Sequence, residues 1–477
     1  MTITWEQVLA FLCEDQTMAI TSLLFLAFFA AVALINYALP RVLRPYFLLA
    51  ASYGFFCYDP VNRPLVWVIA AATVLTWLCG LIIGKVRAKP VRVLALAASV
   101  GFGIGILVYY KYWNLLADTV GGSILSHREN LLAPLGLSYF TFAAMSYTID
   151  VYRGSVPAQK NLINFGAYVA LFPQLIAGPI VRYADIAREL EHREHSWDNA
   201  AAGLRRFLVG LGKKVILADN FALLIRLFRQ SGEKSVLFYW MYAVAFALNI
   251  YFDFSGYSDM AIGLGRVLGF HFVENFNYPY LSGSVTEFWR RWHISLGSWF
   301  RDYVYIPMGG SRVSRWRWVL NILTVWMLTG LWHGAAWNFV LWGLLFAGLL
   351  LAEKWIPALQ RLPGVLRHGY VLLAVVLSFV LFNADSLAQA GQDFAGLFGF
   401  GGLSLTSAET LYYLKSYAVL FVLGILGSTP VVKNAARRID GTKTGVVLEA
   451  AAMLALLIVC TAYLVDGSFS PFLYFRF

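Results

Sequence analysis

Long apolar runs separated by short polar segments occupy most of this chain. They lie near residues 18–39, 46–58, 65–84, 93–110, 369–383, 411–428 and 446–465. The longer runs match the length of about 20 residues with which a helix crosses a bilayer, and they are continuous, whereas barrel strands alternate apolar and polar positions. The pattern therefore predicts an all-α polytopic membrane protein with roughly ten to twelve transmembrane helices.

The middle of the chain departs from this pattern. Residues 161–180 are apolar, but two prolines and a glycine interrupt them and basic residues flank both ends, which favours a re-entrant segment that lines a central cavity. Residues 182–206 and 284–318 are rich in charge and tryptophan and are expected to form interfacial helices. No polar stretch is long enough for a soluble domain, so residues 1–477 are expected to form one membrane domain.

Basic residues in the short loops predict the orientation. Arg41, Arg44 and the group from Lys85 to Arg92 separate early apolar runs, and the group from Lys433 to Lys443 precedes the last one. Lys and Arg accumulate on the cytosolic side of short loops. Both ends of the chain are therefore expected outside, on the side of the membrane opposite the cytosol, with an even number of spans between them.

The composition agrees with a membrane protein. Of the 477 residues, 60% are hydrophobic and 13% are charged, against about 25% charged residues in soluble domains. The net charge of +11 is expected to contact the lipid bilayer rather than nucleic acid, because the basic residues stand beside apolar runs. The four cysteines are scattered without metal-binding spacing, so neither a metal site nor a disulfide framework is expected.

One ionisable residue, His333, stands inside a long apolar run, in the sequence Leu331-Trp332-His333-Gly334. An ionisable group is costly at membrane depth and commonly has a function there, and imidazole exchanges a proton near neutral pH. We interpret His333 as the centre of a membrane-embedded enzyme, with Trp332 as a cavity-lining candidate. A histidine that is only hydrogen-bonded in the core is the alternative.

Two carboxylates form a second group of candidates. Asp253 and Asp259 lie on either side of Gly256, beside an apolar helix. They are candidates for the wall of the cavity, and the alternative is a helix cap followed by an Asx turn around the glycine.

A third group of candidates lies between residues 286 and 303. Arg290 and Arg291 follow Glu287 by three and four positions, so ion pairing along a helix is possible. The arginines could instead bind an anionic donor or contact lipid headgroups. His293 is a candidate catalytic residue, and a structural hydrogen bond at the membrane interface is the alternative.

Several signatures of other enzyme classes are missing from the sequence. It contains no Gly-x-Ser-x-Gly of serine hydrolases, no His-Glu-x-x-His of zinc proteases and no Walker A loop. We therefore expect His333 to act as a general base on an incoming hydroxyl rather than as part of a nucleophilic triad.

Eight segments that cover most of residues 130–340 carry a family resemblance. They are Pro134–Phe142, Tyr147–Gly154, Phe172–Pro179, Tyr251–Gly265, Glu274–Phe276, Thr286–Leu296, Arg301–Tyr303 and Gly330–Gly334. In this order they resemble the membrane-bound O-acyltransferase (MBOAT) family, and within it the bacterial alginate O-acetyltransferase-like branch.

The resemblance implies a fold, a reaction and a site. It implies membrane, re-entrant and interfacial helices around a central cavity, with His333 as the family's essential histidine and His293 as its second recurrent one. The implied reaction moves an acyl group, here acetyl, from a cytosolic thioester such as acetyl-CoA or an acylated carrier to a hydroxyl. The implied final acceptor is an extracytoplasmic polysaccharide such as alginate, peptidoglycan or cellulose, and the implied partner is a periplasmic SGNH-type O-acetyltransferase.

The tail, residues 466–477, also resembles part of this branch. Ser470–Phe477 is similar to a C-terminal Phe-x-Tyr-x-x-Phe type motif whose tyrosine is proposed as an acyl relay, and Tyr474 is the matching residue. The alternative is a simple aromatic belt at the membrane interface. Three other functions stay open: transfer of D-alanyl or another acyl group, a proton-coupled transporter with His333 as relay, and an inert export scaffold.

Overall fold

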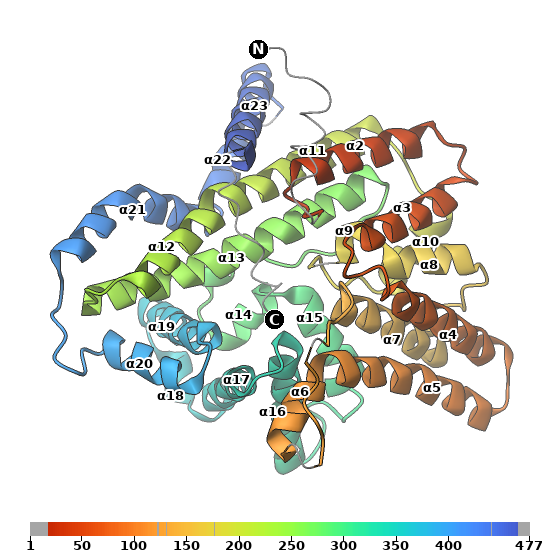
Figure 1. Cartoon of the computed structure of the whole chain (residues 1–477), viewed down its shortest axis with the longest axis horizontal. Coiled ribbons are helices and arrows are strands. Elements are labelled where there is room, and N and C mark those ends of the chain that lie inside the picture. Colours follow the sequence, from red (N-terminus) through yellow and green to blue (C-terminus); the bar gives the residue numbers. More distant parts are fainter. Residues whose placement is uncertain (1–17, 122–123, 130, 176, 440, 466–477) are drawn as a thin grey trace. The chain divides into compact units, whose positions relative to one another are not determined.

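The computed structural model describes residues 18–121, 124–129, 131–175, 177–439 and 441–465. These residues form helices joined by turns, and no strand occurs among them (Figure 1). The predicted all-α fold is confirmed. Two compact units make up the chain, residues 1–207 with 259–273 and residues 208–258 with 274–477. The expectation of a single membrane domain stays a prediction.

Seven helices of the described residues are long and apolar enough to cross a membrane. They are Val66–Lys85, Lys89–Val120, Val236–Val267, Trp337–Trp355, Gly364–Asn383, Ala408–Gly427 and Lys443–Val465. The chain is therefore a multi-pass membrane protein, as predicted. Leu23–Ala38 is also apolar but is shorter than these seven helices. The expected number of roughly ten to twelve spans therefore stays a prediction.

The first unit is a cluster of apolar helices. Its helices are α2 (Leu23–Ala38), α3 (Arg44–Tyr58), α4 (Val66–Lys85), α5 (Lys89–Leu107), α6 (Trp113–Val120), α7 (Leu137–Arg153), α8 (Leu162–Ala170), α9 (Phe172–Leu175) and α10 (Tyr183–Glu191). Helix α7 contacts both α4 and α5 and buries side chains on nearly every face. A helix that is buried on nearly all of its faces lies in an interior, so α7 is the core of this unit.

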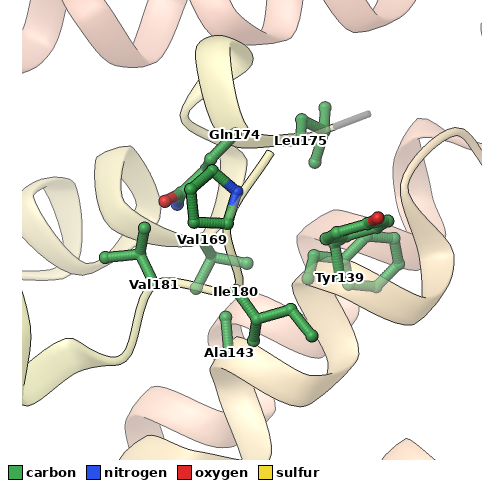
Figure 2. A pocket seen from close by; sticks show the side chains of 9 residues that line it. Tyr139, Ala143, Val169, Gln174, Leu175, Ile180 and Val181 are labelled. Carbon is green, nitrogen blue, oxygen red and sulfur yellow. The ribbon is translucent and has the colours of Figure 1, made fainter. Parts of the chain in front are cut away.

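The apolar stretch 161–180 is interrupted, as predicted. Asn161 Oδ1 caps α8 by accepting the amide N–H of Ile163 at 2.8 Å, and α8 ends at Ala170 before the single turn of α9. The side chains around this break pack closely, and the pocket that they line (Figure 2) has a volume of about 10 Å³. That volume holds one water molecule at most, so this pocket is too small for a substrate.

Helices α11 (Trp197–Gly212) and α13 (Val236–Val267) each contribute residues to both units. The second unit adds α12 (Asp219–Gln230), α14 (Val285–Arg291), α15 (Ile294–Phe300), α16 (Arg315–His333), α17 (Trp337–Trp355), α18 (Pro357–Arg361), α19 (Gly364–Asn383), α20 (Leu387–Leu397), α21 (Ala408–Gly427), α22 (Val431–Ile439) and α23 (Lys443–Val465). The short helices α14 and α15 occupy the stretch that the sequence assigned to interfacial helices.

The alternative of a cap and turn around Gly256 is wrong. Asp253, Gly256 and Asp259 all lie inside the 32-residue helix α13. A Cβ on Gly256 would stand 2.8 Å from the carbonyl oxygen of Gly210 and 3.2 Å from Lys213 Cβ. The glycine therefore permits a close helix approach rather than a turn.

Helices α16 and α17 form a tightly packed pair. A Cβ on Gly330 would overlap the backbone carbonyl of Phe339, and a Cβ on Gly343 would overlap that of Trp326. Small residues let membrane helices approach closely. The two glycines thus bring α17 against the end of α16 that carries His333.

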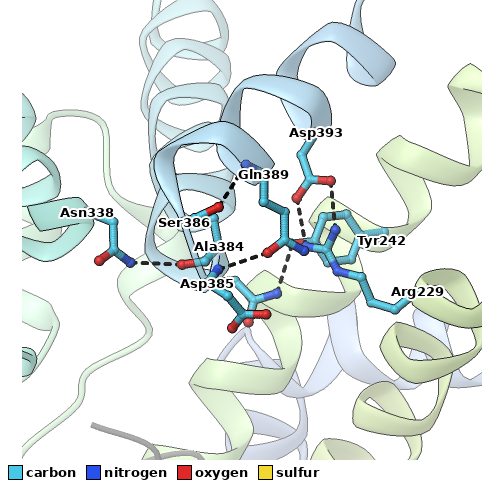
Figure 3. A network of polar contacts seen from close by, with 9 residues as sticks. Arg229, Tyr242, Asn338, Ala384, Asp385, Ser386, Gln389 and Asp393 are labelled. Carbon is cyan, nitrogen blue, oxygen red and sulfur yellow. Dashed lines mark hydrogen bonds and ion pairs between the residues drawn. The ribbon is translucent and has the colours of Figure 1, made fainter. Parts of the chain in front are cut away.

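A polar network joins α20 and the segment before it to other helices of the second unit (Figure 3). Arg229 donates to both carboxylate oxygens of Asp393 at 2.7 Å, and its guanidinium also donates to Tyr242 Oη at 2.6 Å. Asn338, near the start of α17, donates to the carbonyl oxygen of Ala384 at 2.9 Å. The bonds of Arg229 join α12 to α20 and α13, and the bond of Asn338 holds the segment that follows His333 against the segment that follows α19.

Candidate active site

His333 is the last residue of α16 and is 5% exposed. Its ring is surrounded by aromatic rings, with centroid distances of 5.0 Å to Trp332, 5.1 Å to Trp342 and 5.4 Å to Phe382. These rings come from α16, α17 and α19. The close pairing of α16 and α17 therefore places an imidazole inside a mostly apolar environment.

His293 lies beside His333. The centroids of the two imidazole rings are 6.4 Å apart, and Trp332 packs 5.4 Å from the ring of His293. His293 joins α14 to α15 with a φ of 44°, a left-handed conformation that is uncommon for a residue other than glycine. Such backbone strain persists where the surrounding structure enforces it, which is frequent at functional sites.

A hydrogen bond with Asn275 determines the tautomer of His293. Asn275 Oδ1 accepts the amide N–H of Ser295 at 3.3 Å and lies 3.0 Å from His293 Nδ1. Because this oxygen can only accept, His293 Nδ1 must donate, and Nε2 then carries the lone pair of a neutral imidazole. Nε2 is buried without a hydrogen-bond partner in the described part of the chain.

Burial favours the same neutral form. The pKa of His293 lies well below its ordinary value, chiefly because burial removes water from the charged form and secondly because His333 is close. A neutral imidazole with an unoccupied Nε2 can accept a proton or a hydrogen bond from a substrate.

A pocket of about 480 Å³ opens onto His293. Its walls come from α14, α15, the π-helical segment Arg301–Tyr305, α16 and α17. Its polar lining includes Thr286, Arg290, Arg301 and Thr329. The volume is within the usual range for small-molecule sites, about 300–1,000 Å³. It is large enough for part of a small molecule to reach the buried histidine.

The two candidate arginines on α14 differ in their surroundings. Arg291 pairs with Glu287 at 2.8 Å, and the amide N–H of Gly283 and this arginine lower the pKa of Glu287. Arg290 is exposed, lines the pocket and forms no ion pair within the described residues. The predicted intrahelical ion pair therefore exists for Arg291, while Arg290 is available to an anionic ligand.

The start of α14 is held by a residue that the sequence did not suggest. Glu353 on α17 is 7% exposed, and its carboxylate accepts the amide N–H groups of Val285 and Thr286 at 2.5 Å and 3.1 Å. Carboxylates at helix N-termini accept strong, charge-assisted hydrogen bonds. Glu353 thus fixes the helix that carries Arg290.

The remaining candidates lie elsewhere. Asp253 is buried in an ion pair with Lys214 at 2.8 Å, and Lys214 also pairs with Asp219 at 2.7 Å; none of these residues lines the pocket of about 480 Å³. Asp259 belongs to the first unit, where it pairs with Arg206 at 2.8 Å. Tyr474 lies outside the described residues.

Asn275 is the functional candidate that local sequence reasoning missed. It stands 18 positions before His293, and neither periodicity nor a spaced motif connects the two. It did fall inside one short segment of family resemblance, Glu274–Phe276, and that was the only signal. Among the described residues, no cluster of three or more His, Cys, Asp or Glu side chains has the arrangement of a metal site.

Comparisons with known proteins agree with the fold. Residues 135–388 match the model of MBOAT, the membrane-bound O-acyltransferase family. The "Probable alginate O-acetylase AlgI" of Azotobacter vinelandii is 37% identical over 96% of this chain and 100% of its own length. The peptidoglycan O-acetyltransferase of Helicobacter pylori is 28% identical over 95% of this chain and 94% of its own length.

A third relative has a different named activity. The teichoic acid D-alanyltransferase of Bacillus subtilis is 30% identical over 53% of this chain and 67% of its own length. The family match over more than half of the chain and the full-length relatives lead to one conclusion: the chain belongs to the membrane-bound O-acyltransferase family.

Proposed function

We propose that this protein is a membrane O-acetyltransferase that supplies acetyl groups to an extracytoplasmic polysaccharide. The observation that carries the proposal is a pair of buried histidines beside a pocket. His293 lines the pocket together with Arg290, and the ring centroid of His333, which is not part of the pocket lining, lies 6.4 Å from that of His293. The names of the relatives that match the full length of the chain support acetyl as the acyl group and alginate or peptidoglycan as the class of acceptor.

The donor in this proposal is a thioester, acetyl-CoA or an acetylated carrier. Arg290 binds an anionic part of the donor, since a guanidinium forms paired hydrogen bonds with phosphate. His293 Nε2 accepts a hydrogen bond from an amide N–H of the donor and so positions the thioester. This role uses the tautomer that Asn275 enforces.

His333 acts as the general base in the transfer step. The acceptor hydroxyl oxygen bonds to the thioester carbonyl carbon while the hydroxyl proton passes to the imidazole of His333. The tetrahedral intermediate collapses, the carbon–sulfur bond breaks, and the departing thiolate takes the proton from His333. General bases of this kind contribute about 10²–10⁴-fold to a rate.

A relay through the C-terminal tail extends the proposal. Tyr474 accepts the acetyl group as the first hydroxyl, and a periplasmic SGNH-type O-acetyltransferase moves it to the polysaccharide. A phenol has a pKa of about 10, so a base is needed to activate it at neutral pH. The orientation rests on the loop charges, which favour a cytoplasmic (inner) membrane with both ends of the chain in the periplasm.

Thioester turnover tests this function directly. Purified protein in lipid vesicles should consume acetyl-CoA or an acetylated carrier in the presence of an acceptor hydroxyl, and His333→Ala should lower kcat by about 10²–10⁴-fold at equal protein. Turnover that does not depend on His333 would refute the general-base role. Substrate flux without thioester consumption would indicate the proton-coupled transporter instead, and neither flux nor turnover would indicate an inert scaffold.

A second candidate within the same chemistry is transfer of D-alanyl. The D-alanyltransferase relative of Bacillus subtilis favours it, although the match covers only 53% of this chain. Competition between acetyl and D-alanyl thioesters in the same vesicles separates the two. A preference for D-alanyl in kcat/KM would replace acetyl as the transferred group.

A further inference from the structure

A cluster of arginines surrounds His195 in the first unit. Arg44 Nη1 donates to His195 Nδ1 at 3.0 Å, and the side-chain amide of Asn36 lies 3.1 Å from Nε2. Because a guanidinium can only donate, His195 Nδ1 must accept, which makes His195 a neutral imidazole in this arrangement. Nδ1 is engaged by Arg44 and the proton of the neutral ring is on Nε2, so His195 adds no positive charge to the cluster.

Every charged group that shifts the pKa of His195 is an arginine. Burial, followed by Arg44, Arg193 and Arg41, lowers this pKa to about 4. Burial and the neighbouring Arg44 also lower the pKa of Arg193 to about 10. Both shifts indicate a local excess of positive charge.

No carboxylate of the described residues neutralises this charge. Arg44 donates its other hydrogen bonds to the carbonyl oxygens of Leu39 and Tyr37, and Arg193 packs over the ring of Phe270 at 5.1 Å. No ion pair within the described residues involves Arg41, Arg44 or Arg193, and Glu189, four positions before Arg193, is paired with His271 at 2.7 Å. Three cations without a counter-ion form a site for an anion.

The surface beside these arginines is apolar and exposed. Val42 is 76% exposed and Trp197 is 82% exposed, and Leu43 and Tyr46 are also exposed. Tryptophan, tyrosine and aliphatic residues next to basic residues are the usual composition of a segment at the lipid headgroup level. A soluble anion would not explain why these apolar side chains remain uncovered.

We propose that Arg41, Arg44 and Arg193 bind the phosphate of an anionic phospholipid headgroup. Guanidinium groups match phosphate oxygens with paired hydrogen bonds, and the exposed side chains of Val42, Leu43 and Trp197 lie in the adjoining acyl region of the bilayer. The lipid thereby ties the loop before α3 to the loop between α10 and α11. This second loop packs closely against Gly269, where an added Cβ would lie 3.4 Å from Arg193 Cβ and from His195 Cε1.

Lipid titration of the purified full chain tests this proposal. Native mass spectrometry counts bound lipids when the protein in detergent is titrated with phosphatidylglycerol or phosphatidylcholine. The test variant is Arg41→Gln with Arg193→Gln, which spares Arg44 because it also holds two backbone carbonyls. The matched control is Arg87→Gln with Lys89→Gln, which removes the same charge from exposed residues between α4 and the start of α5 in this unit. Circular dichroism melting establishes that each variant is folded.

The expected result separates the test variant from the control. The unchanged protein and the control should prefer phosphatidylglycerol, and the test variant should bind it about tenfold to thirtyfold more weakly, with phosphatidylcholine unaffected. Inorganic phosphate and coenzyme A should not displace the lipid. An equal loss in both variants, or no loss in the test variant, would overturn the site, and displacement by phosphate or coenzyme A would assign it to a soluble phosphate compound instead.

Discussion

Asn275 Oδ1 lies 3.0 Å from His293 Nδ1, and this contact decides which ring nitrogen of His293 carries the proton. Asn275 is itself fixed, since its amide donates to Ser258 Oγ at 3.0 Å and its oxygen accepts from the hydroxyl of Ser295 at 2.9 Å. The orientation of a histidine is commonly set by the hydrogen bond of its second nitrogen. Asn275 is therefore a positioning residue for the proposed reaction.

Replacing Asn275 by aspartate should move the pH profile of transfer. A carboxylate beside Nδ1 favours the charged imidazolium, so the pKa of His293 rises from its lowered value. The neutral form with a free Nε2 is then lost at a higher pH than in the unchanged protein. We expect the acid limb of kcat/KM to shift to higher pH in Asn275→Asp. Asn275→Ala is the control, which should lower activity without that shift, and an unshifted limb in the aspartate variant would contradict the positioning role.

Replacing each of the two arginines of α14 should have a different effect: one substitution should weaken donor binding, and the other should change only stability. Arg290→Gln should raise KM for the thioester donor by roughly tenfold to a hundredfold, since hydrogen bonds to charged groups contribute about 1.5–3 kcal/mol. Arg291→Gln should leave this KM unchanged and lower stability by no more than about 1 kcal/mol, because its pair with Glu287 is partly exposed. Steady-state kinetics and thermal melting of both variants check this difference. Equal effects of the two variants on KM would show that Arg290 has no special role.

Glu353→Gln should loosen the start of α14. The amide keeps one acceptor oxygen but loses the negative charge and presents N–H groups to the N–H groups of Val285 and Thr286. A loss of about 1–3 kcal/mol in stability is expected for a buried donor left unsatisfied, together with a higher donor KM because Arg290 shifts with the helix. Melting curves and kinetics measure both effects. Glu129→Gln, at an exposed position, is the control and should change neither.

Gly330→Ala should destabilise the pairing of α16 and α17. The added methyl would overlap the backbone carbonyl of Phe339, and overpacking of this kind costs about 1–3 kcal/mol. Gly348→Ala on the same helix pair meets open space, so it should be neutral or stabilising by up to about 1 kcal/mol. Detergent-solubilised yield and melting temperature distinguish them. A fully stable Gly330→Ala protein would show that close contact here is not required.

The sequence predicted the features that depend on composition and on exceptional residues. Continuous apolar runs led to an all-α membrane fold because helices alone satisfy their backbone locally in lipid. His333 was identifiable because an ionisable residue in an apolar run is rare. The interruption within 161–180 followed from its prolines, and the structure confirms that break between α8 and α9.

The sequence could not predict features that depend on tertiary proximity. Gly256 was compatible with a turn, and only the close approach of the backbone near Gly210 shows why a glycine stands inside a continuous helix. The spacing of Glu287, Arg290 and Arg291 allowed either arginine to pair, and packing decided between them. Glu353 reaches α14 from a distant helix, which no local pattern encodes.

Ester-linked acetate on cell-envelope polysaccharides is the measurement that tests the proposed function most directly. Cells that express the unchanged protein are compared with cells that express His333→Ala at matched membrane protein levels, and a Tyr474→Phe strain tests the relay in parallel. The account predicts loss of acetate from one polysaccharide in the His333→Ala strain, and the polymer that loses it identifies the acceptor. Unchanged acetate in that strain would contradict an acetyltransferase that depends on His333.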